Sequence, residues 1–381
     1  GASQVHAVAS IAAVGGKFKY QGGGAFWSNR IIFNWNKNVV EGNDVLDNST
    51  RMLDMSRIGP ILTYEDELVR QGPPVTAMLI QNTNPAAVAP DTHRVLRGFR
   101  REDLFLCVHE QFMTETAKMA DIVLPATTFL EHDDLYQAAG QVHVQVHRAV
   151  IDPPGETRSN HWVLCQLAQR LGASHEGFEM TEWELVDRTL RDSGWPGAEE
   201  LLQKKWLDVQ PSFDKAHFLK GFPTANGKFK FSADWSALGP LGHQLPSLPD
   251  YCPNIDLATR DKPFRMITSP ARNFLNSSFT ETPTSKKREG RPEVMIHPEA
   301  ASKLSVLSGD RVRLGNEQGS VVLHAVLFEG VQKDVIVVES VWPNAAFEEG
   351  IGINALISAD AGAPNGGAVF HDTAVWVAKI E

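Results

Sequence analysis

The sequence predicts an α/β domain followed by an all-β domain, and three observations support this fold class. Short apolar runs alternate with helical patterns between residues 75 and 172, which is typical of a parallel sheet covered by helices. Strand-like runs separated by Gly, Asp and Asn turns fill residues 264–381. A stretch rich in Pro, Gly and Leu, residues 239–262, is typical of a linker. We therefore predict an α/β domain at residues 1–250 and a β-barrel domain at residues 263–381.

The bulk composition is that of an ordinary globular protein. Apolar residues make up 42% and charged residues 22% of the 381 residues. No window approaches the roughly 18 uninterrupted apolar residues that a membrane span requires. The net charge of −10 argues against a nucleic-acid partner. It does not exclude a phosphate-bearing cofactor, because local N–H groups and helix ends can hold phosphate.

The N-terminal segment begins without Met and without a signal-peptide pattern. Residues 4–14 have helical periodicity, so residue 1 falls at the lip of a helix, as in a fragment or a processed chain. We expect a cytoplasmic protein, or a periplasmic one if a twin-arginine signal lies upstream. The Gly-rich residues 15–24 predict a loop, and residues 25–74 predict loops with short helical pieces such as Thr63–Gln71.

Three apolar runs predict the strands of the parallel sheet: residues 75–81, 103–108 and 121–125. Because these runs are continuous rather than alternating, we expect a sheet covered on both faces, with Ile122–Leu124 buried. Asp91 is expected to cap a helix that ends at Arg100, and Thr114 a one-turn helix.

Later helices follow the same capping logic. Asn160 is expected to cap a helix that runs through Leu171 and stops at Gly172. Further helices are predicted over Thr181–Asp192 and Gly197–Lys205.

The barrel domain is predicted from five apolar runs and one helix. The runs are "FRMITS", "EVMIH", "DRVRLGN", "GSVVLHAVLF" and "DVIVVESVW". The single predicted helix is "PEAASKL", residues 298–304. Together they predict a compact β-barrel with a small helical insertion.

Polar side chains follow each strand of the predicted sheet, at the edge where ligands bind in open parallel sheets. Asn82 and Asn84 follow the first strand, His109 and Glu110 the second, and Glu131 and His132 the third. Strand ends are also polar simply because loops are exposed, so the pattern alone leaves both interpretations open.

A nucleotide would suit these side chains. A carboxylate such as Glu110 suits guanine, because it accepts from N1–H and the exocyclic amine together. Asparagines can hold ribose hydroxyls or the base carbonyl. The hydroxyls of Thr114 and Thr116 and the N–H groups of their short helix can take a phosphate. N-capping is the alternative role for Thr114, and the two roles are compatible.

Other motifs assign neither a catalytic residue nor a metal site. The histidines at 93, 143, 147, 161 and 175 lack metal-ligand spacing, and the three cysteines form no CxxC pair. His132, Asp133 and Asp134 can bind a metal on composition, but an exposed loop explains them equally well. A P-loop, a G-x-G-x-x-G before a helix and a G-x-S-x-G are all missing, so the catalytic residues stay unknown.

An ordered set of segments resembles a known family. The segments "NTNPAAVAPDTHRVLRGF", "DLFLCVHEQFMTETAKMADIVLPATTFLEHDD", "PPGETRSNHWVLCQLAQRLG" and "FPTANGKFKF" resemble the later part of molybdopterin oxidoreductases of the dimethyl sulfoxide reductase type. The segments "ITSPARNFLNSSF", "HPEAASKLSVLSGDRVRLGNEQGSV" and "GINALISADAGAPNGGAVFHDTAV" resemble the family's molybdopterin-dinucleotide-binding domain. The resemblance implies a Rossmann-like α/β domain followed by a double-psi β-barrel.

The resemblance also implies a cofactor: molybdenum or tungsten on two molybdopterin guanine dinucleotides, used for two-electron redox or oxygen-atom transfer. Around one guanosine-diphosphate arm it places Asn82 or Asn84, His109, Glu110, His132 and Asn160. The segment 269–279, which would lie along the pterin and phosphates, supplies Ser269, Arg272, Asn273, Asn276, Ser277 and Ser278. Further cofactor contacts are implied at Trp342, Asn354 and His371.

The chain departs from the family in three respects. It has no cysteine cluster for a [4Fe–4S] centre and no segment that places Cys, Ser or selenocysteine on the metal. We therefore expect the C-terminal half of a larger enzyme, inactive alone and with little or no bound metal, any [4Fe–4S] centre lying in the other half. Glu110 stands where the family often has Asp, and its longer reach changes the expected hydrogen-bond geometry.

Three hypotheses follow, and the first is the cofactor-binding half of a molybdenum enzyme. The second is a non-catalytic relative, like the large peripheral subunit of respiratory complex I. It is disfavoured because a dead site has no reason to keep Arg272, Asn354 and His371 together. The third is a plain two-domain binding protein. For Arg272, whose guanidinium suits pyrophosphate or pterin oxygens, a surface ion pair is the alternative.

The substrate is expected to be a small molecule. Its identity stays open among formate, sulfur or selenium oxyanions, nitrate, arsenic oxyanions, sulfoxides and hydration chemistry. The partner that the resemblance implies is an electron-transfer subunit with iron–sulfur or cytochrome centres.

Overall fold

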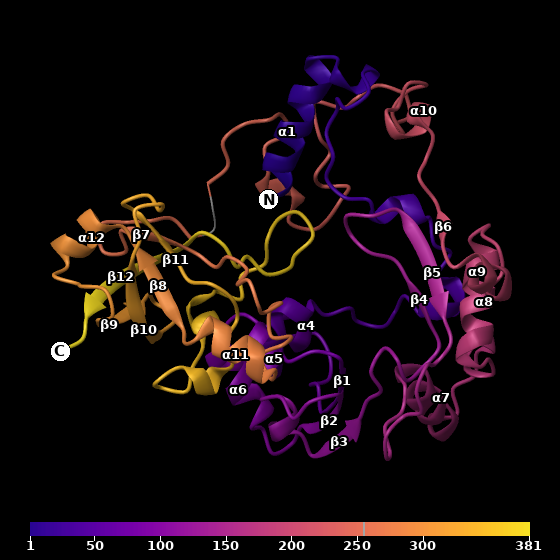
Figure 1. Ribbon diagram of the computed structural model, residues 1–381, viewed down its shortest axis with the longest axis horizontal. Helices are drawn as coiled ribbons and strands as arrows, with labels where there is room; N and C mark the ends of the chain where they lie inside the picture. The colour runs from indigo at the N-terminus through magenta and orange to yellow at the C-terminus, as the bar shows by residue number, and fades with distance from the viewer. Residues whose placement is uncertain (254–255) are drawn as a thin grey trace. The chain divides into compact units, whose positions relative to one another are not determined.

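The computed structural model describes residues 1–253 and 256–381, which pack as two compact units (Figure 1). The first unit comprises residues 1–50, 124–234 and 246–251. The second comprises residues 51–123, 235–245 and the described part of 252–381. Both units combine distant stretches of chain, so packing rather than chain order defines them. The domain limits expected at residues 250 and 263 stay a prediction.

The first unit combines helices with a small antiparallel sheet. Its strands β4 (Asp134–Tyr136), β5 (His143–His147) and β6 (Leu207–Asp208) lie side by side in that order. Its helices are α1 (Ala2–Val14), η1 (Lys17–Lys19), η2 (Arg30–Phe33), α2 (Asn38–Glu41), α7 (Asn160–Leu171), η5 (Glu176–Phe178), α8 (Glu182–Asp192), α9 (Ala198–Lys204) and α10 (Phe213–Ala216). The sequence predicted α1, α8 and α9 close to these bounds. It missed the sheet, because its strands are short and lack a long apolar run.

Helix α7 starts one residue later than its expected cap. The Ser159 hydroxyl accepts a hydrogen bond from the Trp162 N–H at 3.2 Å, so Ser159 is the N-cap and Asn160 the first helical residue. The prediction that Asn160 caps this helix is therefore wrong. The predicted stop is confirmed, because Gly172 takes the left-handed conformation with φ of 71°.

The second unit contains the expected parallel sheet. Strands β1 (Ala77–Gln81), β2 (Phe105–Glu110) and β3 (Ile122–Pro125) lie in that order, and β1 pairs with β2 in parallel. Buried side chains of Ile80, Leu106 and Val108 form its core. The expectation that Ile122 is buried is wrong: Ile122 is 45% exposed, because β3 is an edge strand.

Short helices surround this sheet. They are η3 (Met55–Arg57), α3 (Ile58–Leu62), α4 (Glu67–Arg70), α5 (Pro85–Val88), α6 (Thr92–Phe99) and η4 (Ala117–Met119). The predicted cap of α6 is confirmed, because the Asp91 carboxylate accepts from the Arg94 N–H at 3.3 Å. The single helix expected over Thr63–Gln71 is wrong in extent. Asp66 accepts from the Leu68 N–H at 2.9 Å and so begins the separate helix α4.

The barrel lies in the same unit and is drawn in orange and yellow in Figure 1. Its strands close in the order β10-β8-β11-β7-β12-β9. They are β7 (Phe264–Ile267), β8 (Glu293–Ile296), β9 (Arg311–Gly315), β10 (Ser320–Leu327), β11 (Val335–Val337) and β12 (Thr373–Lys379). Helices α11 (Pro283–Glu289) and α12 (Pro298–Lys303), with the turns η7 (Asn344–Ala346) and η8 (Ile353–Leu356), complete it. The five predicted strands and α12 are confirmed, whereas α11 and β12 were missed.

The predicted linker, residues 239–262, contains the turn η6 (Gly242–Gln244) and otherwise no helix or strand in its described part. Residues 254 and 255 of this stretch lie outside the described residues. Over residues 1–253 and 256–381, none of the helices has the length and apolarity to cross a membrane.

Candidate functional site

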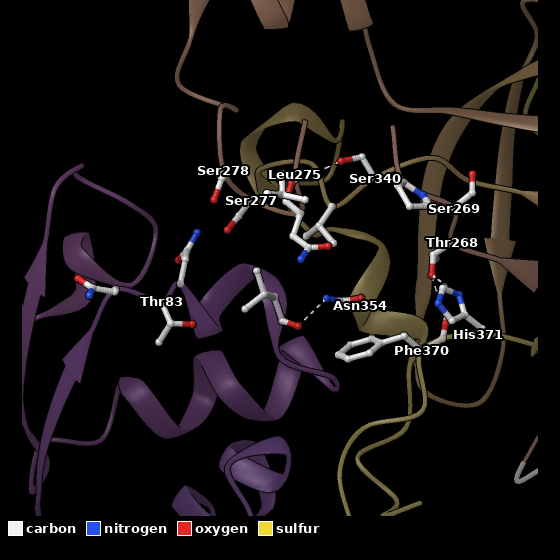
Figure 2. Close-up of a pocket in the computed structure, with 16 residues that line it drawn as sticks. Thr83, Thr268, Ser269, Leu275, Ser277, Ser278, Ser340, Asn354, Phe370 and His371 are labelled. Carbon is white, nitrogen blue, oxygen red and sulfur yellow. Dashed lines mark hydrogen bonds between the residues drawn. The ribbon is translucent and has the colours of Figure 1, made fainter. Parts of the chain in front are cut away.

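A pocket of about 600 Å³ lies in the second unit, where the end of β1 meets loops of the barrel (Figure 2). Three stretches of chain converge on it, as the labelled Thr83, Ser277 and His371 show in Figure 2. Its lining consists of Asn82, Thr83, Asn84, Val88, Thr268, Ser269, Pro270, Leu275, Asn276, Ser277, Ser278, Ser340, Val341, Asn354, Phe370 and His371. All of these residues belong to one compact unit, so the pocket is complete within it.

The lining is rich in hydroxyl and amide groups. Among the described residues that form it there is no Asp or Glu, although the chain as a whole carries a net charge of −10. Hydroxyls, amides and an imidazole can donate hydrogen bonds to phosphate oxygens, which a carboxylate would repel. The pocket therefore suits an anionic, polar ligand.

Asn84 is held in one orientation on the wall formed by residues 82–88, which we call the α5 wall. Its side chain is 6% exposed. Its Oδ1 accepts from the N–H of Thr116 at 3.1 Å and from the Thr116 hydroxyl at 2.8 Å. Its Nδ2 donates to Glu115 Oε2 at 2.8 Å. These partners fix which end of the amide is the oxygen.

Two more asparagines join the barrel to the α5 wall. Asn354, 2% exposed, donates from Nδ2 to the carbonyls of Ala87 and Val88, both at 3.0 Å. Asn344 donates from Nδ2 to the carbonyl of Ala86 at 2.9 Å. The last carbonyls of the short helix α5 thus find partners in the barrel (Figure 2).

The opposite wall is the pocket loop, residues 269–278. The Ser340 N–H donates to the carbonyl of Ser269 at 2.8 Å, and its hydroxyl to the carbonyl of Asn276 at 3.4 Å. Phe274 is buried and meets Trp342 edge-on, with ring centroids 4.9 Å apart. The loop is therefore attached to the barrel both through its backbone and through this aromatic pair.

The pocket brings together eight of the residues expected at the site. They are Asn82, Asn84, Ser269, Asn276, Ser277, Ser278, Asn354 and His371. Asn82 and Asn276 both take the left-handed conformation, with φ of 54° and 50°, which Asn tolerates better than most residues. The ring nitrogen Nδ1 of His371 lies 3.3 Å from the Thr268 hydroxyl.

Other expected residues lie in the same unit but outside the lining. His109 is fully buried, with Nδ1 3.0 Å from Gln81 Nε2. Glu110 Oε1 accepts from the Gln111 N–H at 2.7 Å. The Thr114 hydroxyl accepts from the Ala117 N–H at 3.2 Å, so the capping role considered for Thr114 is present.

The remaining expected residues divide between the units. Arg272 is exposed, and no carboxylate in the described part of the chain pairs with it. Asn273 donates to Glu289 from both its N–H and its side chain. His132 and Asn160 belong to the first unit, where His132 Nδ1 lies 2.8 Å from the Thr127 hydroxyl.

Sequence reasoning missed half of the lining. The missed residues are Thr83, Val88, Thr268, Pro270, Leu275, Ser340, Val341 and Phe370. One of them was visible in principle: Ser340 is a polar residue inside the run "DVIVVESVW", and it is buried with φ of 68°. A polar residue that interrupts an apolar run indicates that the strand ends before it.

A small cavity of about 70 Å³ next to the pocket loop holds charged groups. It is lined by Glu289, Arg291, Glu293, Met295, Val326, Glu339 and Trp342. Burial, and then the nearby carboxylate of Glu289, raise the pKa of Glu339. Over the described residues, no group of three or more His, Cys, Asp or Glu side chains is arranged to hold a metal ion.

Two family models match the chain. Residues 5–170 match the model described as molybdopterin oxidoreductase, and residues 264–374 match the model described as molybdopterin dinucleotide binding domain. A putative dimethyl sulfoxide reductase of Halobacterium salinarum, in its catalytic subunit, is 23% identical over 82% of this chain and 38% of its own length. The chain belongs to the dimethyl sulfoxide reductase family of molybdopterin oxidoreductases.

Other members of the family agree. The probable oxidoreductase YoaE of Bacillus subtilis is 32% identical over 99% of this chain and 54% of its own length. The trimethylamine-N-oxide reductase of Haemophilus influenzae is 26% identical over 78% of this chain and 40% of its own length. The chain thus spans about half the length of the curated family members it matches.

A solved structure supports the fold. Acetylene hydratase from Pelobacter acetylenicus matches with a TM-score of 0.67 and 19% identity, covering 85% of this chain and 46% of that chain. At this identity the likeness concerns the fold alone. It agrees with an α/β part and a closed six-stranded barrel.

Proposed function

We propose that the pocket holds the dinucleotide part of a molybdopterin guanine dinucleotide, in a molybdenum or tungsten oxidoreductase that carries out two-electron redox or oxygen-atom transfer. The observation that carries the proposal is the lining: hydroxyls, amides and His371 without a carboxylate, in an acidic chain that belongs to a molybdopterin family. The bound cofactor would supply the redox chemistry, and this chain would bind and orient it.

The lining suggests a division of roles. Ser269, Ser277 and Ser278 would donate to the phosphates, and Asn82 and Asn84 would hold ribose or base groups. Glu110 stays our candidate for the guanine edge, and His109, His132, Asn160 and Arg272 stay candidates from the resemblance. In the same proposal the two parts of the fold are Rossmann-like and double-psi, respectively.

The proposal for the whole enzyme extends beyond this chain. It includes a protein ligand to the metal, a [4Fe–4S] centre and a partner for electron transfer, all outside these residues, and a cytoplasmic location. Support for a partner comes from relatives such as the F420-dependent formate dehydrogenase of Methanocaldococcus jannaschii, whose alpha chain is 27% identical over 72% of this chain and 40% of its own length.

Titration calorimetry with guanosine diphosphate, a mimic of one dinucleotide arm, tests the pocket. We expect the chain to bind this probe. Ser277→Asp places a carboxylate in the lining and should weaken binding about tenfold or more, since like charges repel in a desolvated site. Ser302→Asp, at an exposed position on α12, is the matched control and should bind as the unaltered chain does. Absence of binding, or equal binding by both variants, would contradict the proposal.

A further inference from the structure

We propose that two carboxylates outside the pocket lining, Glu115 and Glu289, set the shape of the pocket by holding its two walls. Glu115 holds the α5 wall, and Glu289 holds the pocket loop. Both are positioning residues, because they act through Asn84, Asn344 and Asn273 rather than through the ligand. Only the identity of the ligand rests on the proposed function.

Glu115 bridges the α5 wall and the barrel. Its Oε2 accepts from Asn84 Nδ2 at 2.8 Å, and its Oε1 accepts from the N–H of Asn344 at 3.0 Å. Asn84 lines the pocket, and Asn344 in turn binds the carbonyl of Ala86 and accepts from the N–H of Gly352 at 2.8 Å. One carboxylate thus connects the sheet side of the pocket to the loop that leads to Asn354.

Glu289, at the end of α11, acts on the opposite wall with a different geometry. Its Oε1 alone accepts both from the N–H of Asn273, at 2.5 Å, and from Asn273 Nδ2, at 2.7 Å. Ser340 holds Ser269 and Asn276, so Glu289 supplies the attachment at the middle of the pocket loop.

The two geometries respond differently to the exchange of Glu for Gln, which replaces one oxygen by an NH₂ donor. At position 289 the remaining oxygen can still accept both bonds. At position 115 both oxygens are used, so one donor always faces another donor. Turning the Asn84 amide cannot relieve this conflict, because Asn84 Oδ1 already accepts twice from Thr116.

The charged surroundings of Glu289 favour the same contrast. Arg291, Glu293 and Glu339 line one small cavity with it. Neutralising position 289 removes the repulsion between Glu289 and Glu339, so Glu289→Gln loses no favourable contact with Asn273 and relieves an unfavourable one.

Hydrogen exchange of the ligand-free, full 381-residue chain gives the first test. Glu289→Ala should speed exchange at the Asn273 amide about tenfold, whereas Glu289→Gln should leave it within about twofold of the unaltered rate. Glu115→Gln should speed exchange at the Asn344 amide about tenfold. Peptides from β10 report in each variant whether the barrel is folded.

Guanosine diphosphate binding by calorimetry gives the second test. Glu115→Gln and Glu289→Ala should each weaken binding about tenfold, and Glu289→Gln should bind like the unaltered chain. Glu281→Ala, an exposed glutamate between the pocket loop and α11, is the matched control and should change neither readout.

The contrast between the two Gln variants decides the inference. Equal effects of Glu115→Gln and Glu289→Gln, in either direction, would overturn it, as would unchanged exchange at Asn273 in Glu289→Ala. If the unaltered chain does not bind guanosine diphosphate, the proposed function fails, and the exchange rates still decide the role of the two carboxylates. The Gln variants are close in shape to Glu, so the comparison does not depend on the Ala variant folding.

Discussion

At the residue scale, Thr116 shows how burial restricts a side chain that composition leaves free. From sequence, its hydroxyl could bind a phosphate. In the structure it is fully buried, accepts from the Ala86 N–H at 3.0 Å and donates to Asn84 Oδ1. Both of its hydrogen-bonding directions are therefore used within the protein, and its contribution to a ligand is the placement of Asn84.

Thr116→Val tests this role. The substitution keeps the shape but leaves the Ala86 N–H without an acceptor and Asn84 without one donor. We expect a loss of about 1–3 kcal/mol in the free energy of unfolding, measured by urea denaturation. Thr116→Ser keeps the hydroxyl and should lose less than half as much. Equal losses in the two variants would mean that the methyl packing, and not the hydroxyl, matters.

Glu339 gives a pH dependence with a definite sign. Burial and the Glu289 carboxylate raise its pKa above the ordinary value of 4.5. The folded state therefore holds this proton more tightly than the unfolded state, and stability falls as pH rises through the interval above 4.5. Glu339→Gln should be more stable than the unaltered chain at pH 7 and should gain nothing below about pH 4. Urea denaturation across this range measures it, with the exposed Glu329→Gln as control.

At the scale of elements, capping residues and apolar runs predicted the structure well where they act locally. The barrel strands follow their apolar runs, and Asp91 caps α6 as expected. The prediction for Asn160 was wrong because the neighbouring Ser159 has the shorter side chain that reaches the Trp162 N–H. The prediction for Ile122 was wrong because an apolar run does not reveal whether its strand is central or at an edge.

Helix α4 offers an acid-sensitive element. Burial tends to raise the pKa of Asp66, but hydrogen bonds from Arg57, at 2.6 Å, and from the Leu68 N–H outweigh it and lower the pKa below 3.8. The stabilisation is therefore present above pH 3.8 and is lost as pH falls further. Asp66→Asn should flatten the acid limb of the stability curve, measured by denaturation between about pH 2 and 6. An unchanged acid limb would contradict this role.

At the scale of the whole molecule, the order of segments predicted the family and the barrel, but not the full pocket. Asn82, Asn84 and Ser277 were expected at the site, whereas Thr268 and Ser340 were not. The missed residues lie where distant loops meet, and local periodicity does not encode which loops meet. The short sheet of the first unit was missed for a related reason, because β6 pairs with β5 across a long separation in the chain.

The placement of the pocket in one unit gives a prediction for the molecule as a whole. A ligand that binds only the folded state stabilises it by RT ln(1 + [L]/Kd), about 2.7 kcal/mol at a hundredfold excess over Kd. Guanosine diphosphate should therefore slow hydrogen exchange in peptides from β1 and the pocket loop, which belong to the second unit. Peptides from β5 and α8 of the first unit should show a smaller change. Uniform protection over both units would contradict it.

The hydrogen bonds of Asn354 to the α5 wall have a consequence for how the protein forms. Asn354 and Val88 are 266 positions apart in the chain, so this contact closes a very long loop. Contacts of such long range form slowly, after the local helices and hairpins. A chain emerging from the ribosome would therefore own both walls of the pocket long before the pocket itself. Ligand competence should be among the last properties acquired during folding, which makes it a sensitive reporter of complete assembly.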